Sequence, residues 1–413
     1  MKMLKNIDEE VYNALLCEQK KQRDTIGLIP SENIVSRDVL KLMGSVFTNK
    51  YAEGYPGKRY YGGCRFVDEI ENLAIKRACM LLGAEHANVQ PHSGSQANMA
   101  AYFSVLKPGD KILAMDILAG GHLTHGLKVN FSGIFYQAVF YNVERETEEI
   151  DYDRVREIAL KEKPKMIVCG ASSYSRIIDF NKFYNISQEV GAYLLADIAH
   201  IAGLVVANLH PSPVHLADFV TSTTHKTLRG PRGGLVLCKK EYSNKLDNSI
   251  IPGIQGGPLM HIIAAKALAF KEAMRPDFFD YQKQIIKNCK KLCEEFKNRN
   301  YRIVSGGTDN HLFVIDLRNK RINGNEYEKL LEEVGIITNK NLIPYDPQPP
   351  SITSGLRIGT PLVTSRGMKE NDMALIAEWM DDTLKNRENK KVLKDIAKKV
   401  RRFAHEFPIY PSA

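Results

Sequence analysis

The hydrophobic positions of this chain alternate between helical spacing and short apolar runs. Residues 69–82 carry apolar side chains at the spacing of a helix, and five short runs are typical of buried strands. These runs occupy residues 111–115, 165–169, 193–196, 219–222 and 235–238. Strands separated by helices require crossover connections, so the pattern predicts an α/β fold with a largely parallel sheet and helices on both faces.

The pattern changes near residue 275. A long helical stretch that begins near Pro258 is interrupted at Arg275-Pro276, and a lysine-rich helix is predicted from near Tyr281. Short strands beside helices, followed by a pair of C-terminal helices, are typical of a smaller α+β domain; the strands are predicted at residues 311–317, 335–338 and 355–359. We therefore expect an N-terminal arm (1–24), a large domain (25–275) and a small C-terminal domain (276–413).

Charge is concentrated at the end of the chain. The net charge is +9, and basic residues crowd positions 385–402. Apolar residues recur there at helical spacing, which predicts an amphipathic helix with a basic outer face; they are Val392, Leu393, Ile396, Val400 and Phe403. This face leaves RNA binding open as a secondary property only.

Composition narrows the class of protein further. The 413 residues are 44% hydrophobic and 25% charged, as in ordinary globular proteins. The longest apolar stretch, 192–207, contains Asp197 and His200, so it predicts buried core and no membrane span. The N-terminus lacks a secretory signal and is acidic, which favours a cytoplasmic location. Seven cysteines without a Cys-x-x-Cys pair suggest neither disulfides nor zinc.

Polar residues follow apolar runs at three places where a parallel sheet would bind a ligand. Ser93-Gly94-Ser95 opens a predicted helix, where it would serve either as an ordinary N-cap or as a phosphate cradle. Asp197 ends an apolar run and requires a proton-donating partner, unless it is itself an N-cap. Lys226 emerges from an apolar run among hydroxyl groups, and desolvation there would make its amine nucleophilic, although a lone lysine is usually solvated.

The three places together favour one cofactor. Pyridoxal phosphate needs a phosphate site, an acidic partner for its pyridine nitrogen and a lysine that forms a Schiff base. The order of cradle, acid and lysine along this chain supplies all three.

From about Leu28 to Gly367 the sequence closely resembles the serine hydroxymethyltransferases. The resemblance is carried by NKYAEGYPGKRYYGG at 49–63, QPHSGSQ at 90–96, GGHLTHG at 120–126, TTHKTLRGPRGG at 223–234, QGGPL at 255–259 and SGLRIGT at 354–360. It implies the aspartate-aminotransferase type of fold (pyridoxal-phosphate fold type I), a homodimer or a tetramer, and conversion of serine and tetrahydrofolate to glycine and methylenetetrahydrofolate.

The resemblance also implies roles for individual residues around the cofactor. Lys226 would form the internal aldimine, Asp197 would pair with the pyridine nitrogen, and His122 would stack on the ring. The other cofactor contacts would be Ser93, Gly94 and Ser95 at the phosphate, Ser172 and His200 at the phenolic oxygen, His225 beside the lysine, and Tyr51, Gly256 and Gly257 from the partner subunit.

Substrate roles follow from the same resemblance. Arg357 would bind the amino-acid carboxylate with help from Ser31 and Tyr61, and Glu53 would be the acid or base, with Tyr51 and Tyr60 nearby. The implied catalytic set is Lys226, Glu53, His225, Asp197 and Thr223. Folate would contact Ile117, Gly121, His122, Leu123, Asn341, Pro350 and Ser351.

Two positions depart from the family pattern. Ala119 stands where histidine is usual and Ala171 where an aromatic is common, so we expect a wider rim and weaker folate binding. His122 and His125 are three residues apart but show no third ligand, so no metal is expected. The alternative activities are those of related pyridoxal-phosphate enzymes, such as an α-methylserine hydroxymethyltransferase or a threonine aldolase.

Overall fold

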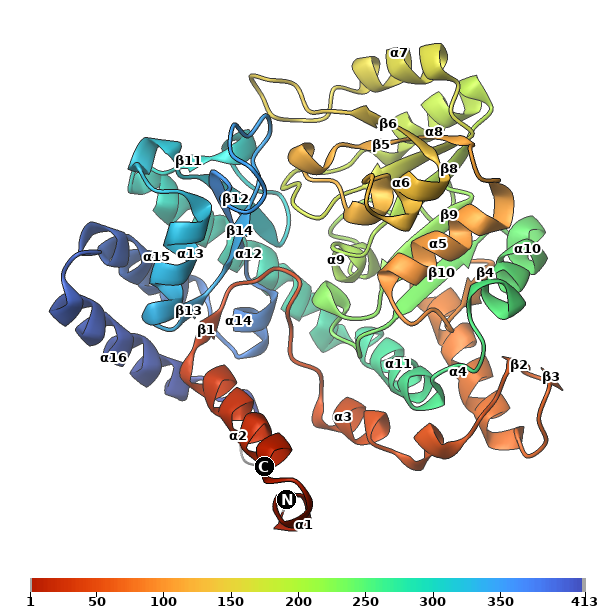
Figure 1. The fold of residues 1–413 in the computed structure, drawn as a ribbon, viewed down its shortest axis with the longest axis horizontal. Helices are drawn as coiled ribbons and strands as arrows, with labels where there is room; N and C mark the ends of the chain where they lie inside the picture. The colour runs from red at the N-terminus through yellow and green to blue at the C-terminus, as the bar shows by residue number, and fades with distance from the viewer. Residues whose placement is uncertain (1, 411–413) are drawn as a thin grey trace.

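The computed structural model describes residues 2–410, and its centre is a seven-stranded sheet (Figure 1). The strand order is β4-β10-β9-β8-β7-β5-β6. The strands are β4 (His86–Asn88), β5 (Lys111–Met115), β6 (Gln137–Tyr141), β7 (Met166–Gly170), β8 (Tyr193–Asp197), β9 (Phe219–Thr223) and β10 (Gly234–Cys238). From β9 to β6 all neighbours are parallel, whereas β10 is antiparallel to β9 and β4. The predicted α/β class is therefore confirmed.

Helices cover both faces of this sheet, and the strands at its centre are buried almost throughout. In β7, Ile167 and Cys169 pack in the core beneath four helices, while Met166 and Val168 pack on the opposite face with α5. The first face is covered by α4 (Arg65–Leu82), α7 (Tyr152–Glu162), α8 (Phe180–Val190) and α11 (Met260–Ala273), and the second by α5 (Gly94–Val105). Such two-sided burial explains why the strands appear in the sequence as continuous apolar runs.

A second body begins with the long helix α12 (Pro276–Asn298), which runs away from the central sheet (Figure 1). Pro276 occupies the first turn, where its fixed φ suits a helix and its missing N–H is not needed. The expectation that this helix starts near Tyr281 was therefore wrong by five residues. The body's antiparallel sheet comprises β11 (Arg302–Ile303), β12 (Leu312–Asp316), β15 (Gly355–Gly359) and β14 (Asn339–Asn341).

Helices α13 (Gly324–Glu333), α15 (Glu370–Lys385) and α16 (Lys390–Glu406) complete this second body. The predicted amphipathic helix corresponds to α16, whose Leu393, Ile396 and Val400 are buried while its lysines face outward. Its apolar stripe packs in the second core, so the basic residues are left on the solvent side.

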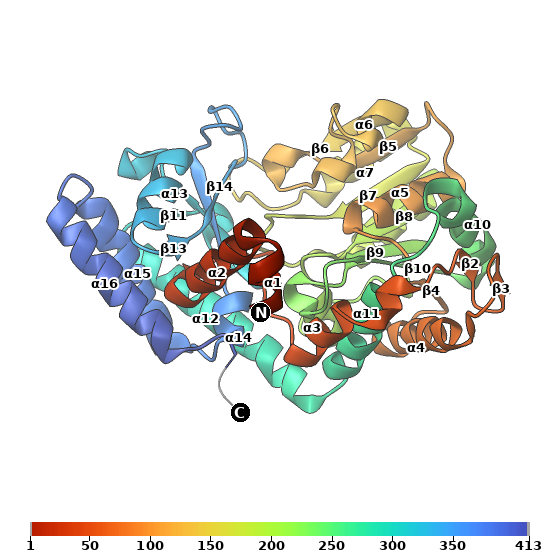
Figure 2. The same cartoon turned by 60° about the horizontal axis from the view of Figure 1, so that its bottom comes forward.

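The N-terminal segment belongs by packing to the second body (Figure 2). Helix α2 (Glu9–Asp24) lies against α16, and β1 (Ile26–Gly27) pairs in parallel with β13 (Ile336–Ile337). Ile26 and Leu28 are fully buried in the second core, although the sequence-based division placed residues 25–275 in the large domain. That division stays a prediction, and this packing is a refinement of it.

Short elements connect these layers. They are α1 (Lys2–Ile7), α3 (Arg37–Met43), β2 (Gly54–Tyr55), β3 (Lys58–Arg59), α6 (Phe131–Phe135), α9 (Ala202–Val206), α10 (Ser243–Asn248) and α14 (Pro361–Ser365). Helical turns of other types occur at Val46–Asn49, Ile117–Ala119, Leu123–His125, Lys226–Leu228, Lys240–Tyr242, Ser249–Ile254, Val304–Gly306 and Arg318–Lys320. Within residues 2–410, no helix is both long and apolar enough to cross a membrane.

Candidate active site

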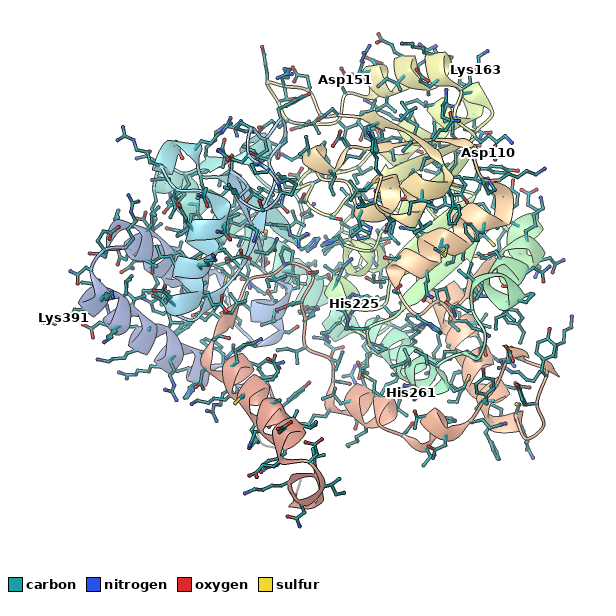
Figure 3. The ribbon with its side chains drawn as sticks, in the orientation of Figure 1. Asp110, Asp151, Lys163, His225, His261 and Lys391 are labelled. Carbon is teal, nitrogen blue, oxygen red and sulfur yellow. The ribbon has the colours of Figure 1, made fainter. Side chains whose placement is uncertain are left out.

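A cavity of about 360 Å³ lies at the carboxyl ends of β7, β8 and β9, where an open parallel sheet binds its ligands. It is lined by Ser31, Ser93, Gly94, Ser95, His122, Ala171, Ser172, Asp197, Ala199, His200, Thr223, His225, Lys226, Arg232 and Arg357. Arg357 comes from β15 of the second body, and Figure 3 shows His225 at the junction of the two bodies. The cavity therefore collects most of the cofactor residues expected from the sequence.

Lys226 lies in a tight turn directly after β9. Its φ is +60°, a left-handed conformation that is unusual for a residue with a side chain, and its carbonyl accepts a hydrogen bond from Asn33 Nδ2 at 2.7 Å. The side chain is almost fully buried, and this desolvation, together with the nearby positive charge of Arg357 and Arg232, lowers the pKa of Lys226 to about 8 despite the opposing effect of Asp197. About a tenth of its amine is therefore neutral and nucleophilic at pH 7, far more than for a lysine in solvent.

Asp197 ends β8 and faces the same cavity with its carboxylate held by three donors. Asn98 Nδ2 and His125 Nε2 donate to Oδ2 at 2.9 and 3.1 Å, and the Ala199 N–H donates to Oδ1 at 3.0 Å. Burial alone would raise the pKa of Asp197, but the interactions with His125, His122 and Asn98 together outweigh burial and hold that pKa below its ordinary value. The carboxylate is therefore ionised and suited to hold a protonated ring nitrogen.

His122, His125 and Asp197 together bring three possible metal-ligand atoms within 4.8 Å of one another. The sequence had shown no third ligand for the two histidines, and Asp197 is that group. Hydrogen bonds already occupy these atoms, however: His125 Nδ1 accepts from the His122 N–H at 3.2 Å, and His122 Nδ1 lies 2.7 Å from Thr124 Oγ1. We interpret the trio as a chain of hydrogen bonds that orients His122 toward the cavity.

Ser93, Gly94 and Ser95 form the N-terminus of α5 at the cavity wall. Ser93 Oγ caps the helix by accepting from the Gln96 N–H at 3.2 Å, and the first N–H groups of a helix have no partner within the helix. A Cβ at Gly94 would lie only 2.8 Å from Thr223 Cγ2. The two interpretations of this motif are thus compatible, since the serine caps the helix while its free N–H groups and dipole suit a phosphate.

Three histidines near the cavity are neutral. Burial lowers the pKa of His122 to about 4 and of His225 to about 3, and places that of His200 well below its ordinary value. His200 Nδ1 lies 3.2 Å from Nε2 of His311, whose stacked ring the sequence did not identify as part of the site. His225 Nδ1 is buried and has no hydrogen-bond partner among residues 2–410, so it remains for a ligand.

Arg357 is a cation whose position the protein fixes. Its Nη1 donates to the Ser172 carbonyl at 2.7 Å, and its Nε donates to Asn339 Oδ1 at 3.2 Å. Burial lowers the pKa of Arg357 to about 10, so the group stays charged at neutral pH. A planar guanidinium held in this way is suited to bind a carboxylate at two points.

Other expected site residues lie outside this cavity lining. The rings of Tyr51 and Tyr61 pack edge to face with their centroids 5.1 Å apart, and the Tyr61 hydroxyl lies 3.5 Å from Glu53 Oε2. Gly256 and Gly257 lie next to these residues, since a Cβ on Gly257 would lie 2.8 Å from Tyr51 Cζ. The residues outside the lining are Tyr51, Glu53, Tyr60, Tyr61, Gly256, Gly257, Ile117, Gly121, Leu123, Asn341, Pro350 and Ser351.

The two alanines that depart from the family pattern are in different surroundings. Ala171 lines the main cavity, as expected. Ala119 is 4% exposed and lines a separate void of about 10 Å³ with Gly120, Ser173 and Tyr174. The expectation that both alanines widen the same rim is therefore supported at Ala171 only.

A desolvated lysine, an ionised aspartate and a helix N-terminus at the ends of parallel strands define the class: an enzyme built to hold a phosphorylated aldehyde cofactor. The family model described as serine hydroxymethyltransferase matches residues 4–380. The chain therefore belongs to the serine hydroxymethyltransferase family, which consists of pyridoxal-phosphate-dependent transferases of fold type I. The family and fold inferred from the sequence are confirmed.

Proposed function

We propose that this chain transfers the hydroxymethyl group of L-serine to tetrahydrofolate, giving glycine and 5,10-methylenetetrahydrofolate in a reversible reaction. The observation that carries the proposal is the sharing of one cavity by Lys226, with its lowered pKa, and the fixed guanidinium of Arg357. One group suits an aldehyde and the other a carboxylate, which are the functional groups of the cofactor and of an amino acid.

The residues present fit pyridoxal phosphate. The phosphate would bind at Ser93, Gly94 and Ser95, where Gly94 has no space for a side chain because a Cβ would lie 2.8 Å from Thr223 Cγ2. When bound, the cofactor supplies an electron sink for negative charge developing on the amino acid. Asp197 would keep the ring nitrogen protonated, because its own pKa is held low and it accepts bonds from His125 and Asn98.

The amino acid would be oriented by its carboxylate. Arg357 would bind that carboxylate beside Ser31, which lines the same cavity. The neutral imidazole of His225, with its free Nδ1, would donate or accept a hydrogen bond without adding charge near Lys226. His122, also neutral, would lie against the cofactor ring, and Ser172 and His200 would bind its phenolic oxygen.

The remaining groups would come from a second copy of the chain. Tyr51, Tyr60 and Tyr61 are 56%, 72% and 47% exposed, and they lie with Glu53 outside the Lys226 cavity. Exposed aromatic residues grouped in this way suit a subunit interface. We propose a homodimer in which Glu53 handles the proton of the serine hydroxyl at the partner's site, with folate near Leu123 and Asn341.

The direct test is substitution of the lysine. Lys226→Ala should abolish serine cleavage while pyridoxal phosphate still binds noncovalently at the cradle, and Lys271→Ala, an exposed change on α11, should alter neither. Activity would be measured as formaldehyde-equivalent transfer to tetrahydrofolate, and cofactor retention by visible absorbance after gel filtration. Serine cleavage at the wild-type rate in Lys226→Ala would refute the assignment. Full activity of the wild type without tetrahydrofolate would favour the aldolase alternative.

A further inference from the structure

Lys266 is a fully buried cation that the proposed reaction does not use. It lies in the middle of α11 and is 1% exposed. Its Nζ donates to three backbone carbonyls: Val89 at 2.6 Å, Gly234 at 2.8 Å and Pro91 at 3.1 Å. These bonds use all three N–H groups of an ammonium. Its three hydrogen bonds all go to backbone carbonyls, and the buried carboxylate of Glu71 lies near enough to favour the charged form without bonding to it.

The three carbonyls belong to the two segments that border the cofactor cavity. Val89 and Pro91 lie between β4 and the cradle that begins at Ser93, and Gly234 begins β10 after the turn that follows Lys226. The Gly234 N–H also donates to the Pro91 carbonyl at 2.9 Å. Lys266 therefore joins the approach to the phosphate cradle with the segment that leads away from the catalytic lysine.

The surroundings are built around this side chain. A Cβ on Gly233 would lie 2.5 Å from Lys266 Cε, and a Cβ on Gly234 would lie 2.2 Å from the Ser93 carbonyl oxygen. Burial lowers the pKa of Lys266 to about 7 against the opposing effect of Glu71, whereas the three carbonyl acceptors around Nζ need three N–H donors and so favour the ammonium form. A methionine would fill the same space without that cost but would leave three buried carbonyls unpaired, so the lysine is explained by the bonds it makes and not by its volume.

We propose that Lys266 is a positioning residue for the cofactor. Its ammonium group would act as a bound monovalent cation does, by holding the phosphate cradle and the turn that contains Lys226 in fixed positions relative to each other. By drawing the Val89, Pro91 and Gly234 carbonyls to one point, it fixes the peptide planes that lead into Ser93. It also places positive charge behind the phosphate site. The inference rests on the proposed assignment of Ser93–Ser95 to the cofactor phosphate.

The test compares Lys266→Met with Lys271→Met, an exposed change on the same helix. The dissociation constant of the apoenzyme would be measured for pyridoxal phosphate and for pyridoxal, which lacks the phosphate. We expect Lys266→Met to weaken the binding of pyridoxal phosphate by about tenfold or more and to weaken the binding of pyridoxal much less, because the cradle loses a charge-assisted hydrogen-bond partner. Unchanged binding of pyridoxal phosphate to a folded variant, or equal weakening of both ligands, would overturn the proposal.

A chemical rescue keeps the test decisive should Lys266→Met fold poorly. Lys266→Ala would be prepared in propylammonium, which replaces the missing side chain, and assayed before and after its removal, with propanol as the uncharged control. Restoration of pyridoxal-phosphate affinity by propylammonium and not by propanol supports the cation role. Equal rescue by both compounds, or affinity that does not depend on either, contradicts it. Wild-type enzyme that fails to bind pyridoxal phosphate would instead refute the proposed function.

Discussion

The reactivity of Lys226 depends on where its side chain is buried. In solvent a lysine amine has a pKa of about 10.4, whereas burial lowers the pKa of Lys226 to about 8. The amine must be neutral to attack an aldehyde, so the reactive fraction grows as the pH rises through that lower value. The cavity thus moves the nucleophile's titration toward neutral pH.

We therefore expect the rate of covalent cofactor attachment to apoenzyme to rise about thirtyfold between pH 6.5 and 9 and to level off above the Lys226 pKa of about 8. Stopped-flow absorbance across that range measures it. A small-molecule lysine analogue serves as the reference, because its rate should continue to rise beyond pH 10. A rate for the enzyme that rises in parallel with the analogue would show that Lys226 is not desolvated.

Ala119 provides a second test at the scale of one residue. Its side chain borders a void of only about 10 Å³ beside Gly120 and Ser173, which cannot admit an imidazole. Ala119→His should destabilise the fold by ~1–3 kcal/mol through overpacking and should not tighten folate binding. Ala171→Phe is the matched change at the main cavity, where the added ring contacts ligand space and folate affinity should respond.

Urea unfolding and folate titration of both variants measure these effects. Tighter folate binding by Ala119→His at undiminished stability would contradict the account of its surroundings.

At the scale of elements, one buried side chain joins the two ends of the chain. The guanidinium of Arg366 donates to the Thr25 carbonyl beyond α2 and to the Ala404 and Phe407 carbonyls at the end of α16. The last carbonyls of a helix have no partner within it. Arg366 therefore supplies donors, and a positive charge, to the C-terminal ends of two helices at once.

Arg366→Met should lower the free energy of unfolding by ~2–4 kcal/mol, because several buried carbonyls lose their partner. It should also expose the chain near residue 25 to proteases, since α2 loses its attachment. Arg401→Met is the control: it removes an ion pair to Asp24 on the same pair of helices, but Arg401 is half exposed and such pairs contribute little. Thermal unfolding and limited proteolysis compare the two, and equal effects would argue against the anchoring role.

The elements that could be predicted from the sequence are those whose burial leaves a direct pattern. β5 and β15 lie at the residues predicted for them. Both strands are buried except at one charged residue each, Lys111 and Arg357, so their apolar runs mark their limits closely. β4 and β6 were missed: β4 is a three-residue segment with His86 and Asn88, and β6 has Gln137 and Phe140 exposed. The antiparallel direction of β10 leaves no local signal either, since it follows from pairing between distant segments.

The candidate site likewise contains residues that a local sequence pattern reveals and residues that only contacts between distant segments reveal. Asp197 and Lys226 were found because each interrupts or ends an apolar run, which is a local feature. Asn98 and His311 were not found, and His125 was considered only as a metal ligand, since the roles of all three depend on which side chains they contact across the fold. No regular pattern in the sequence marks tertiary contacts of this kind.

At the scale of the whole molecule, the residues of the proposed site fall into two separate groups on one chain. Lys226, Asp197 and Arg357 share the central cavity, whereas Glu53 and Tyr51 form a cluster with Gly256 and Gly257 outside its lining. Arg59 anchors the second cluster, donating to the Ala52 and Gly54 carbonyls and to Glu71. The backbone on both sides of Glu53 is thus held in place, and Glu53 lies outside the lining of the cavity. In the proposed two-fold dimer, each subunit would lend its cluster to the other.

Subunit mixing tests this arrangement. A Lys226→Ala chain and a Glu53→Gln chain should each be inactive alone, yet a heterodimer would contain one site with both defects and one with neither. Random association makes about half of the dimers mixed, so co-expression should restore about a quarter of wild-type sites. Co-expression is needed because an obligate interface exchanges slowly. Differently tagged chains allow the heterodimer to be purified and its serine cleavage measured. Inactivity of that verified heterodimer would place Glu53 and Lys226 in the same subunit's site and refute the shared arrangement.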